Sequence, residues 1–374
     1  MVGTGGKGLA ALPPESVRER EGMRRETLSP RERWLAVFKR EKPDRTPMDF
    51  WGTDEAVASL MNHTGCASRR AALEKLHIDF AVKLEPLYAG PPLPPGLDAF
   101  GRLYQKITYE TGVYDECVNS PLSAFTSVAG IERAYIWPSP DWWDYGLLPA
   151  QLAGLEMYPV QGGGSEPFLI YKDLRGQEQA FVDLVENPDI VHYCLDKLFA
   201  LAYENTQRIF ETVPGRVTFT YVAEDMGAQN DLMISVKHVR EYLLPGMKKI
   251  MNLSHQGGAY VFHHNDGAIR RILPDLVAAG IDLLNPIQWR CDGMEREDLK
   301  KDFGSKIIFH GGMDNQQTLP FGSVDDVRRE VLDNLEILGR DGGYILAPCH
   351  NVQALTPPEN IVAMYETCYE NSCA

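Results

Sequence analysis

The residues of this chain that could do chemistry gather where short apolar segments end. The stretch Gly258–Gly267 reads GAYVFHHNDG, so an apolar run leads directly into His263, His264 and Asp266. Successive side chains of a strand point to opposite faces, which places His264 and Asp266 on one face and His263 on the other. Imidazole and carboxylate groups are common zinc ligands. The pattern predicts that His264 and Asp266 are site residues. It predicts that His263 packs against a helix.

Two further apolar segments end in comparable groups. One is followed by Glu224 and Asp225, and another by His350. If these segments are parallel strands of one barrel, their carboxyl ends share an edge with His264. Together with His264 and Asp266 they predict a divalent metal site, with zinc favoured. Each of these residues alone also has an ordinary structural explanation, such as a carboxylate that caps the following helix.

A second tier of polar residues follows other expected strands. Asn285, Gln288, Asp314 and Asn351 offer hydrogen-bonding groups at such ends, and we expect them to contact the substrate. Tight turns between strands and helices explain these residues equally well. Cys349 could act as a nucleophile or as a thiolate ligand, but a free cysteine is commonly a small buried hydrophobe.

Strands and helices alternate along most of the chain. The expected strands start near Met48, Ile78, Phe168, Val217, Tyr260, Ile281, Ile307 and Tyr344. Eight strand–helix units without a Gly-rich dinucleotide fingerprint predict an α/β fold of the (β/α)8 or TIM-barrel type, rather than a doubly wound sheet. Residues 90–164 are rich in proline, glycine and aromatic residues, and they predict an elaborated insertion. We expect one barrel domain over residues 29–374, preceded by a flexible tail over residues 1–28.

We also make predictions for residues that do not lie at strand ends, namely four aromatic residues and one arginine. Trp137, Trp142, Trp143 and Tyr145 of the insertion could wall a pocket for a flat substrate, or they could form a satellite core. Arg45 precedes the first expected strand, at the end of the barrel away from the site. We expect a structural ion pair there.

The composition narrows the class of partner. The chain has 374 residues and a net charge of −15, from 37 basic and 52 acidic residues. Nucleic acids and anionic membranes favour basic surfaces, so we expect a small-molecule substrate or a protein partner instead, and a homodimer is compatible with the chain. The Cys residues have no framework spacing, which indicates reduced thiols and a cytoplasmic location. No apolar run approaches the roughly 20 residues of a membrane span.

Several motifs resemble the uroporphyrinogen decarboxylase superfamily. They are His264–Gly267, Asn285–Gln288, Phe309–Asp314, Gly342–Pro348, Pro43–Pro47 and Asp225–Gln229. The resemblance covers nearly everything after residue 30 and implies a (β/α)8 barrel. The haem-pathway decarboxylase has an arginine-rich loop after its first strand, whereas here Asp49–Glu55 contains no arginine. This acidic loop at the opening of the barrel would repel a polyanionic porphyrinogen. The chain is therefore more similar to the cobalamin-dependent methyltransferase branch.

That branch binds zinc through a His-x-Cys pair and a later Cys, and the resemblance places this ligand set here. The positions correspond to His264, Asp266 and either His350 or Cys349. Aspartate in place of cysteine makes a harder site, which suits an oxygen-centred substrate better than a thiol.

The resemblance therefore implies zinc-dependent transfer of a methyl group between an ether-like substrate, for example an aromatic one, and the cobalamin of a separate corrinoid protein. Glu224 or Asp225 would be a fourth ligand or the general acid. Two alternatives stay open. One is a decarboxylase or lyase that acts on a small carboxylic acid without cobalamin, with Asp225 and His264 transferring protons. The other is a binding subunit without catalytic activity.

Overall fold

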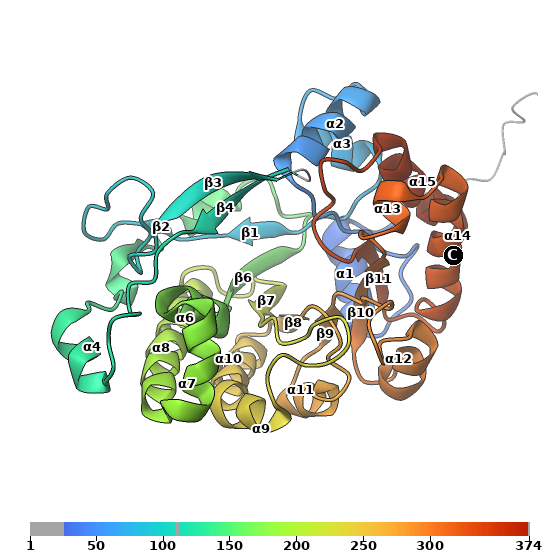
Figure 1. Ribbon diagram of the computed structural model, residues 1–374. Helices are drawn as coiled ribbons and strands as arrows, with labels where there is room; N and C mark the ends of the chain where they lie inside the picture. Colours follow the sequence, from blue (N-terminus) through green and yellow to red (C-terminus); the bar gives the residue numbers. More distant parts are fainter. Residues whose placement is uncertain (1–25, 110–111, 373–374) are drawn as a thin grey trace, which may run out of the picture.

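A curled parallel sheet forms the centre of the molecule (Figure 1). The computed structural model describes residues 26–109 and 112–372, so the expected tail over residues 1–28 lies almost entirely outside the described residues. Seven strands follow the order β1-β6-β7-β8-β9-β10-β11, and every neighbouring pair is parallel. The strands are β1 (Val82–Leu84), β6 (Val160–Ser165), β7 (Phe219–Val222), β8 (Tyr260–His264), β9 (Leu283–Asn285), β10 (Ile308–Met313) and β11 (Tyr344–Pro348).

Helices follow most of these strands and cover the outside of the sheet (Figure 1). Those up to β7 are α1 (Pro30–Phe38), α2 (Asp54–Thr64), α3 (Arg69–Lys75), α4 (Val128–Ala134), α5 (Leu148–Gln151), α6 (Pro167–Arg175), α7 (Gln177–Glu186) and α8 (Pro188–Thr212). Those after β7 are α9 (Val236–His238), α10 (Leu244–Gln256), α11 (Leu273–Ala279), α12 (Arg296–Phe303), α13 (Thr318–Phe321), α14 (Val324–Ile337) and α15 (Pro358–Ser372). Within the described part of the chain, no helix combines the length and apolar character that a membrane crossing requires.

The predicted α/β class is confirmed, and the predicted eight-stranded barrel is seen in part. The segment at Met48, expected as the first strand, makes a single parallel bridge to Leu346 of β11. On its other side, the Asp79 N–H donates to the Met48 carbonyl. Among the described residues these contacts do not build a regular eighth ladder. The sheet curls as in a barrel, and its carboxyl ends gather on one side.

The prediction of a third strand near Phe168 is wrong, because this segment is helix α6. Pro167 occupies the first turn, and Phe168, Tyr171 and Leu174 are buried at helical spacing. The strand is β6, immediately before it, whose glycine-rich sequence VQGGGS lacks an apolar run. A Cβ atom on Gly164 would lie 1.7 Å from the Tyr221 carbonyl oxygen. The close approach of β6 to β7 therefore requires the glycine that hid the strand.

The expected insertion contains a hairpin and a small satellite core. β3 (Tyr104–Tyr109) and β4 (Gly112–Cys117) form the antiparallel hairpin, which lies above β1 in Figure 1. β2 (Leu87–Tyr88) pairs with β5 (Trp143–Asp144). Tyr145 is buried in the satellite core, with Trp143 packed against it. Both expectations for these aromatics are met in part, since Trp143 also lines the cavity described below.

The interior of the curled sheet is built in two layers. The lower layer is apolar and consists of Phe219, Phe262, Leu283, Ile308 and Ile345, with Trp34 and Phe38 of α1 packed against it. The Trp34 ring stacks on Phe219 with 5.3 Å between ring centres. Two positions further along their strands come Tyr221, His264, Asn285 and His310. Strand alternation therefore sets a polar layer above an apolar floor.

A buried ion cluster lies at the opposite end of the sheet from these polar strand ends. Asp79 is fully buried, and its carboxylate accepts hydrogen bonds from Arg33 and Arg45. The Arg45 Nη1–Asp79 Oδ2 distance is 2.7 Å. Arg45 thus makes the ion pair expected from the sequence. Arg33 also pairs with Asp44, at 2.7 Å.

Replacing Asp79 with alanine should destabilise the fold strongly, because two buried guanidinium groups would lose their shared carboxylate. We expect a loss of about 3–5 kcal/mol in the free energy of unfolding, measured by chemical denaturation. The control is Arg328→Ala, which removes an exposed ion pair to Asp325 at 3.2 Å. That change should cost at most about 1 kcal/mol. Equal losses in the two variants would contradict a structural role for the buried cluster.

Candidate metal centre

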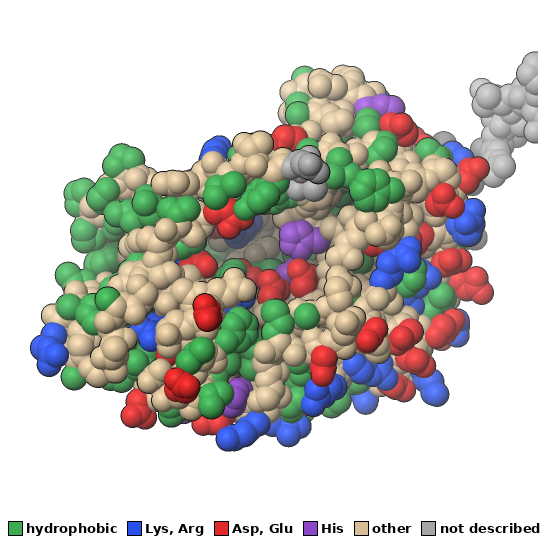
Figure 2. All heavy atoms as spheres, viewed as in Figure 1, with side chains coloured by type: hydrophobic (Ala, Val, Ile, Leu, Met, Phe, Trp, Pro, Cys, Tyr) green, Lys and Arg blue, Asp and Glu red, His purple; other side chains and the backbone are tan. Residues whose placement is uncertain are grey.

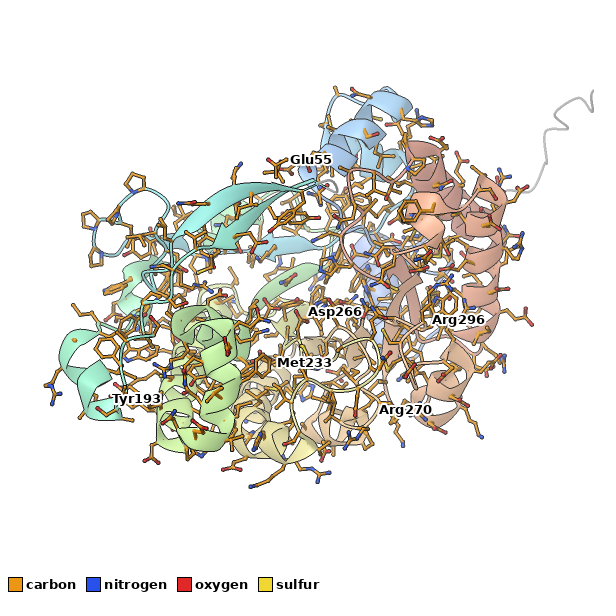
Figure 3. All side chains as sticks on the ribbon, in the orientation of Figure 1. Glu55, Tyr193, Met233, Asp266, Arg270 and Arg296 are labelled. Carbon is orange, nitrogen blue, oxygen red and sulfur yellow. The ribbon has the colours of Figure 1, made fainter. Side chains whose placement is uncertain are left out.

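Three side chains converge at the carboxyl ends of β7 and β8. Asp225, His264 and Asp266 each offer a ligand atom, and these atoms lie within 4.8 Å of one another. His264 Nε2 is 3.5 Å from Asp225 Oδ1 and 3.9 Å from Asp266 Oδ1. Figure 3 shows Asp266 near the middle of the molecule, whereas Arg270 and Arg296 lie out among the helices. The structure therefore brings together three of the five predicted residues.

The loops that carry the two aspartates are held tightly against each other. The Asp266 N–H donates to Asp225 Oδ1 at 3.3 Å. Gly267 has a φ of 87°, and a Cβ on it would lie 2.5 Å from the Gly227 carbonyl carbon. Only glycine allows this approach. The Gln288 side-chain oxygen accepts from the Gly267 N–H at 2.6 Å, so Gln288, expected at the substrate, supports the loop.

One nitrogen of His264 is engaged and the other is available. Nδ1 lies 2.6 Å from Oδ1 of Asn285, its partner in the β8–β9 ladder. Nε2 faces the two aspartates, as a metal ligand would. Asn285 is fully buried and also contacts His310. Both polar atoms of the Asn285 side chain are therefore engaged by histidines, and the residue holds His264 in place.

The three residues fit a divalent metal such as zinc. Asp266 Oδ1 is buried and has no hydrogen-bond partner among the described residues. A buried carboxylate oxygen without a partner is unfavourable unless a cation satisfies it. Burial also raises the pKa of Asp266, and His264 opposes that rise. One imidazole nitrogen and two carboxylate oxygens are ligands that zinc accepts.

His350 lies at the rim of this group. Its Nε2 is 3.9 Å from Asp266 Oδ2, and its ring centre is 6.5 Å from that of His264. The side chain is 41% exposed. Asp225 thus takes the place in the compact group that the resemblance gave to His350. Cys349 is buried, donates to the Ile287 carbonyl and has a pKa raised well above its ordinary value by burial, so it is the imidazole that faces the site.

Glu224 has a different task from its neighbour Asp225. Its side chain is fully buried, and its carboxylate accepts from the Phe168 N–H at 2.8 Å and the Leu169 N–H at 3.3 Å. These groups belong to the first turn of α6, whose N-terminus favours a negative charge. Burial raises the pKa of Glu224, against these hydrogen bonds. The structure places Glu224 as a helix cap outside the metal group.

Of the remaining predicted residues, some support the local structure and one lines a cavity. Asp314 is nearly buried, pairs with Arg290 at 2.6 Å and accepts from the Thr318 N–H. It supports a turn, in agreement with the structural alternative. Asn351 lines the cavity described next. His263 is fully buried and lies outside the metal group. Its Nδ1 lies 2.6 Å from the Val222 carbonyl oxygen, and burial lowers its pKa to about 4.

A cavity of about 1150 Å³ lies close to His264, separated from it by the Trp51 and Tyr221 rings that line the cavity. Figure 2 shows a hollow on this face, with histidine and carboxylate side chains in and beside it. Trp51 and Tyr221 line the cavity, and their ring centres lie 5.6 and 5.8 Å from that of His264. Further aromatic walls come from Tyr88, Tyr104 and Trp143. The cavity therefore suits a flat or apolar group placed next to the metal centre.

Sequence reasoning missed two residues of this cavity, Glu166 and Tyr221. Both residues line the cavity beside Trp51. Burial raises the pKa of Glu166, with a further rise from Asp225 and an opposing effect of His264. Burial also raises the pKa of Tyr221. Glu166 follows the hidden strand β6, while the alternation from Phe219 could have placed Tyr221 inside the sheet.

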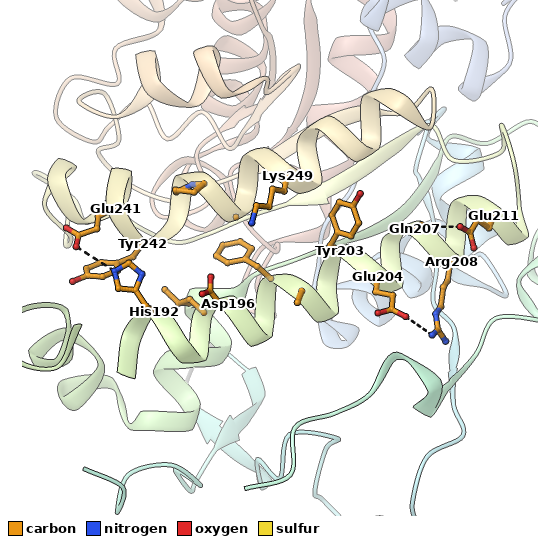
Figure 4. A pocket seen from close by; sticks show the side chains of 15 residues that line it. His192, Asp196, Tyr203, Glu204, Gln207, Arg208, Glu211, Glu241, Tyr242 and Lys249 are labelled. Carbon is orange, nitrogen blue, oxygen red and sulfur yellow. Dashed lines mark hydrogen bonds and ion pairs between the residues drawn. The ribbon is translucent and has the colours of Figure 1, made fainter. Parts of the chain in front are cut away.

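A second cavity, of about 1090 Å³, lies between α8 and α10 (Figure 4). Four of its charged or titratable side chains form two ion pairs. Arg208 Nη2 lies 2.6 Å from Glu204, and His192 Nε2 lies 3.7 Å from Glu241. This groove on the outside of the sheet therefore offers no cluster comparable to the three residues at the carboxyl ends.

The contrast between Asp225 and Glu224 can be measured. Asp225→Ala should weaken zinc binding by more than the roughly 10–100-fold typical of outer-shell partners, with zinc affinity measured by competition with a chelator. Glu224→Ala should instead leave zinc affinity within about threefold. It should lower the free energy of unfolding by about 1–3 kcal/mol for each N–H group left unpaired. Loss of zinc binding only in Glu224→Ala would show that the two roles are assigned the wrong way round.

Comparison with known proteins places the chain in a family. Residues 153–371 match the family described as uroporphyrinogen decarboxylase (URO-D). The uroporphyrinogen decarboxylase of Neisseria meningitidis serogroup C is 24% identical over 228 residues, which are 58% of this chain and 56% of that protein. The match thus spans about half the length of that relative. The enzyme of the same name from Hydrogenovibrio crunogenus is 21% identical, over 91% of this chain and 97% of its own.

A solved structure shares the fold over nearly the whole length. It is a methyltransferase from Methanosarcina mazei, with a TM-score of 0.64 and 19% identity, covering 92% of this chain and 99% of that one. At this identity the likeness shows the fold alone. The family match covers more than half of the chain. The protein therefore belongs to the uroporphyrinogen decarboxylase family.

Proposed function

We propose that this protein is a metal-dependent methyltransferase. It would move a methyl group between an oxygen-centred, ether-like substrate and the cobalamin of a separate corrinoid protein. The observation that carries the proposal is the compact group Asp225, His264 and Asp266 beside a cavity with aromatic walls. The fold shared with a methyltransferase supports the choice of this branch of the family.

The ligand set bears on the substrate class. Asp225, His264 and Asp266 would hold the zinc ion, which when bound supplies Lewis acidity toward the oxygen that carries the methyl group. Two carboxylates and one imidazole make a harder site than thiolates do. Such a site matches an oxygen atom better than a sulfur atom. We therefore keep the ether-like substrate as the proposal.

The cavity residues would bind the substrate and supply a proton. Trp51 and Tyr221 would pack against a flat group and exclude water from the site. When the bond between oxygen and methyl breaks, the oxygen keeps the electron pair and needs a proton. Glu166, a carboxyl group with a raised pKa that lines the cavity together with Tyr221, would donate it. This role replaces the one expected for Glu224.

The charge of the cavity disfavours a polyanionic substrate. Its acidic lining residues are Glu85, Asp115, Glu116, Glu166 and Asp173, and its basic ones are Lys83 and Arg102. Arg102 is already paired with Asp98 and Asp173, at 2.8 and 2.7 Å. A porphyrinogen with several carboxylates would meet repulsion here. The reaction named for the relatives from Neisseria and Hydrogenovibrio is therefore not the one we propose.

The proposal predicts methyl transfer to free cob(I)alamin from a panel of methoxylated aromatic compounds by the zinc-loaded protein. Formation of methylcobalamin is followed by its absorbance. Asp266→Ala should lower the rate by about 100-fold or more, because it removes a ligand. His255→Ala, which removes only an exposed ion pair to Asp282 at 2.8 Å, should react like the wild type.

Two outcomes would contradict the proposal. One is the absence of methyl transfer from the whole panel by protein that carries stoichiometric zinc. The other is release of carbon dioxide from a small carboxylic acid without any corrinoid, at a rate that Asp266→Ala leaves unchanged. The second result would establish the decarboxylase alternative.

A further inference from the structure

We propose that Asp49 is a positioning residue that fixes, through His310 and Asn285, which nitrogen of His264 faces the metal centre. The three residues form a buried chain of hydrogen bonds that ends on His264. Its importance for zinc rests on the function proposed above. The direction of the hydrogen bonds is independent of that function, because the side chains of this protein alone determine the direction.

The chain is continuous and closed to solvent. His310 Nε2 lies 3.1 Å from Asp49 Oδ2. His310 Nδ1 lies 2.7 Å from Asn285 Nδ2, and Asn285 Oδ1 lies 2.6 Å from His264 Nδ1. Asn285 and His310 are fully buried, and Asp49 and His264 are each 4% exposed. Water therefore has little access to supply alternative partners along the chain.

The carboxylate at the far end sets the direction of every bond. An ionised carboxylate only accepts, so His310 must donate from Nε2. A neutral imidazole that donates from Nε2 has its lone pair on Nδ1, and this atom accepts from the Asn285 amide nitrogen. The amide oxygen then faces His264, which donates from Nδ1. The lone pair of His264 is left on Nε2, toward Asp225 and Asp266.

The reverse direction would disable the site. If the Asn285 amide were turned over, His310 would carry its proton on Nδ1 and present a lone pair to the Asp49 carboxylate. His264 would carry its proton on Nε2 and offer no lone pair to a metal. Two facing lone pairs in a buried place are strongly unfavourable, because neither group can turn to water. Asp49 thus selects the metal-binding tautomer from a distance.

Asp49 itself is held firmly by its surroundings. The Tyr365 hydroxyl donates to its carbonyl oxygen at 2.7 Å, and its N–H donates to the Leu346 carbonyl at 2.8 Å. The Trp51 indole N–H donates to Oδ2 at 3.0 Å. The His310 ring packs edge-on against Phe262, with 5.0 Å between ring centres. Neither end of the His310–Asp49 bond can move aside without losing other contacts.

Nitrogen-15 NMR of the histidine rings in the metal-free protein tests this inference, at a pH well above the ordinary histidine pKa. His264 should carry its proton on Nδ1 alone. In Asp49→Leu the direction is no longer enforced, so the Nε2–H form of His264 should appear, and zinc affinity should fall by about tenfold or more. Asp49→Asn keeps an acceptor oxygen for His310 and should restore zinc affinity to within about threefold of wild type.

Two further variants separate positioning from general damage. Tyr365→Phe removes a buried hydrogen bond to the Asp49 main chain but leaves the side-chain relay intact. It should lower stability without changing the His264 tautomer or zinc affinity. If Asp49→Leu does not fold, Asn285→Asp and Asn285→Leu replace it. The aspartate still accepts from His264 Nδ1 and should keep the tautomer, whereas the leucine should lose it.

A proton on Nε2 of His264 in the wild type, alone or together with one on Nδ1, would overturn the inference. So would an unchanged tautomer in both folded Asp49→Leu and Asn285→Leu. Absence of zinc binding in a wild type whose His264 is protonated on Nδ1 would refute the proposed metal centre and leave the positioning role of Asp49 established. The two proposals therefore fail in distinguishable ways.

Discussion

The candidate site depends on one hydrogen bond, the 2.6 Å contact between His264 Nδ1 and Asn285 Oδ1. The two residues are partners in the β8–β9 ladder, so the register of the sheet brings their side chains together. This bond fixes the plane of the imidazole and directs Nε2 toward Asp225 and Asp266. Without it, a buried histidine beside two aspartates would be an ion pair with no preferred geometry for a metal.

The layers of the sheet interior protect this hydrogen bond from water. Strand alternation places the polar layer of Tyr221, His264, Asn285 and His310 directly above the apolar layer that contains Phe262, and Trp34 packs against that apolar layer. The floor excludes water from below, which strengthens the hydrogen bonds and raises the cost of leaving any of them unmade. The cavity opens on the other side, past Trp51 and Tyr221. The polar layer is therefore open toward the cavity and closed by apolar side chains on the other side.

The sequence predicted the strand ends well and the roles of adjacent residues poorly. The apolar runs before His264 and Asp225 marked real strands, and alternation correctly separated His263 from His264. Glu224 and Asp225 follow the same strand, and which of them enters the site depends on the position of α6, a non-local fact. Glu166 was not predicted as a site residue because β6, the strand before it, is rich in glycine and lacks the apolar run that marks a strand. The pairing of Asn285 with His264 follows from the register of β9 against β8, which a single sequence does not reveal.

We infer that Asp225, His264 and Asp266 hold a divalent metal. The most direct measurement is the anomalous difference density of crystals soaked in zinc, recorded on both sides of the zinc absorption edge. We expect one strong peak at the carboxyl ends of β7 and β8, bounded by His264 Nε2 and one oxygen from each aspartate. A peak placed elsewhere, or no peak at these three residues, would contradict it.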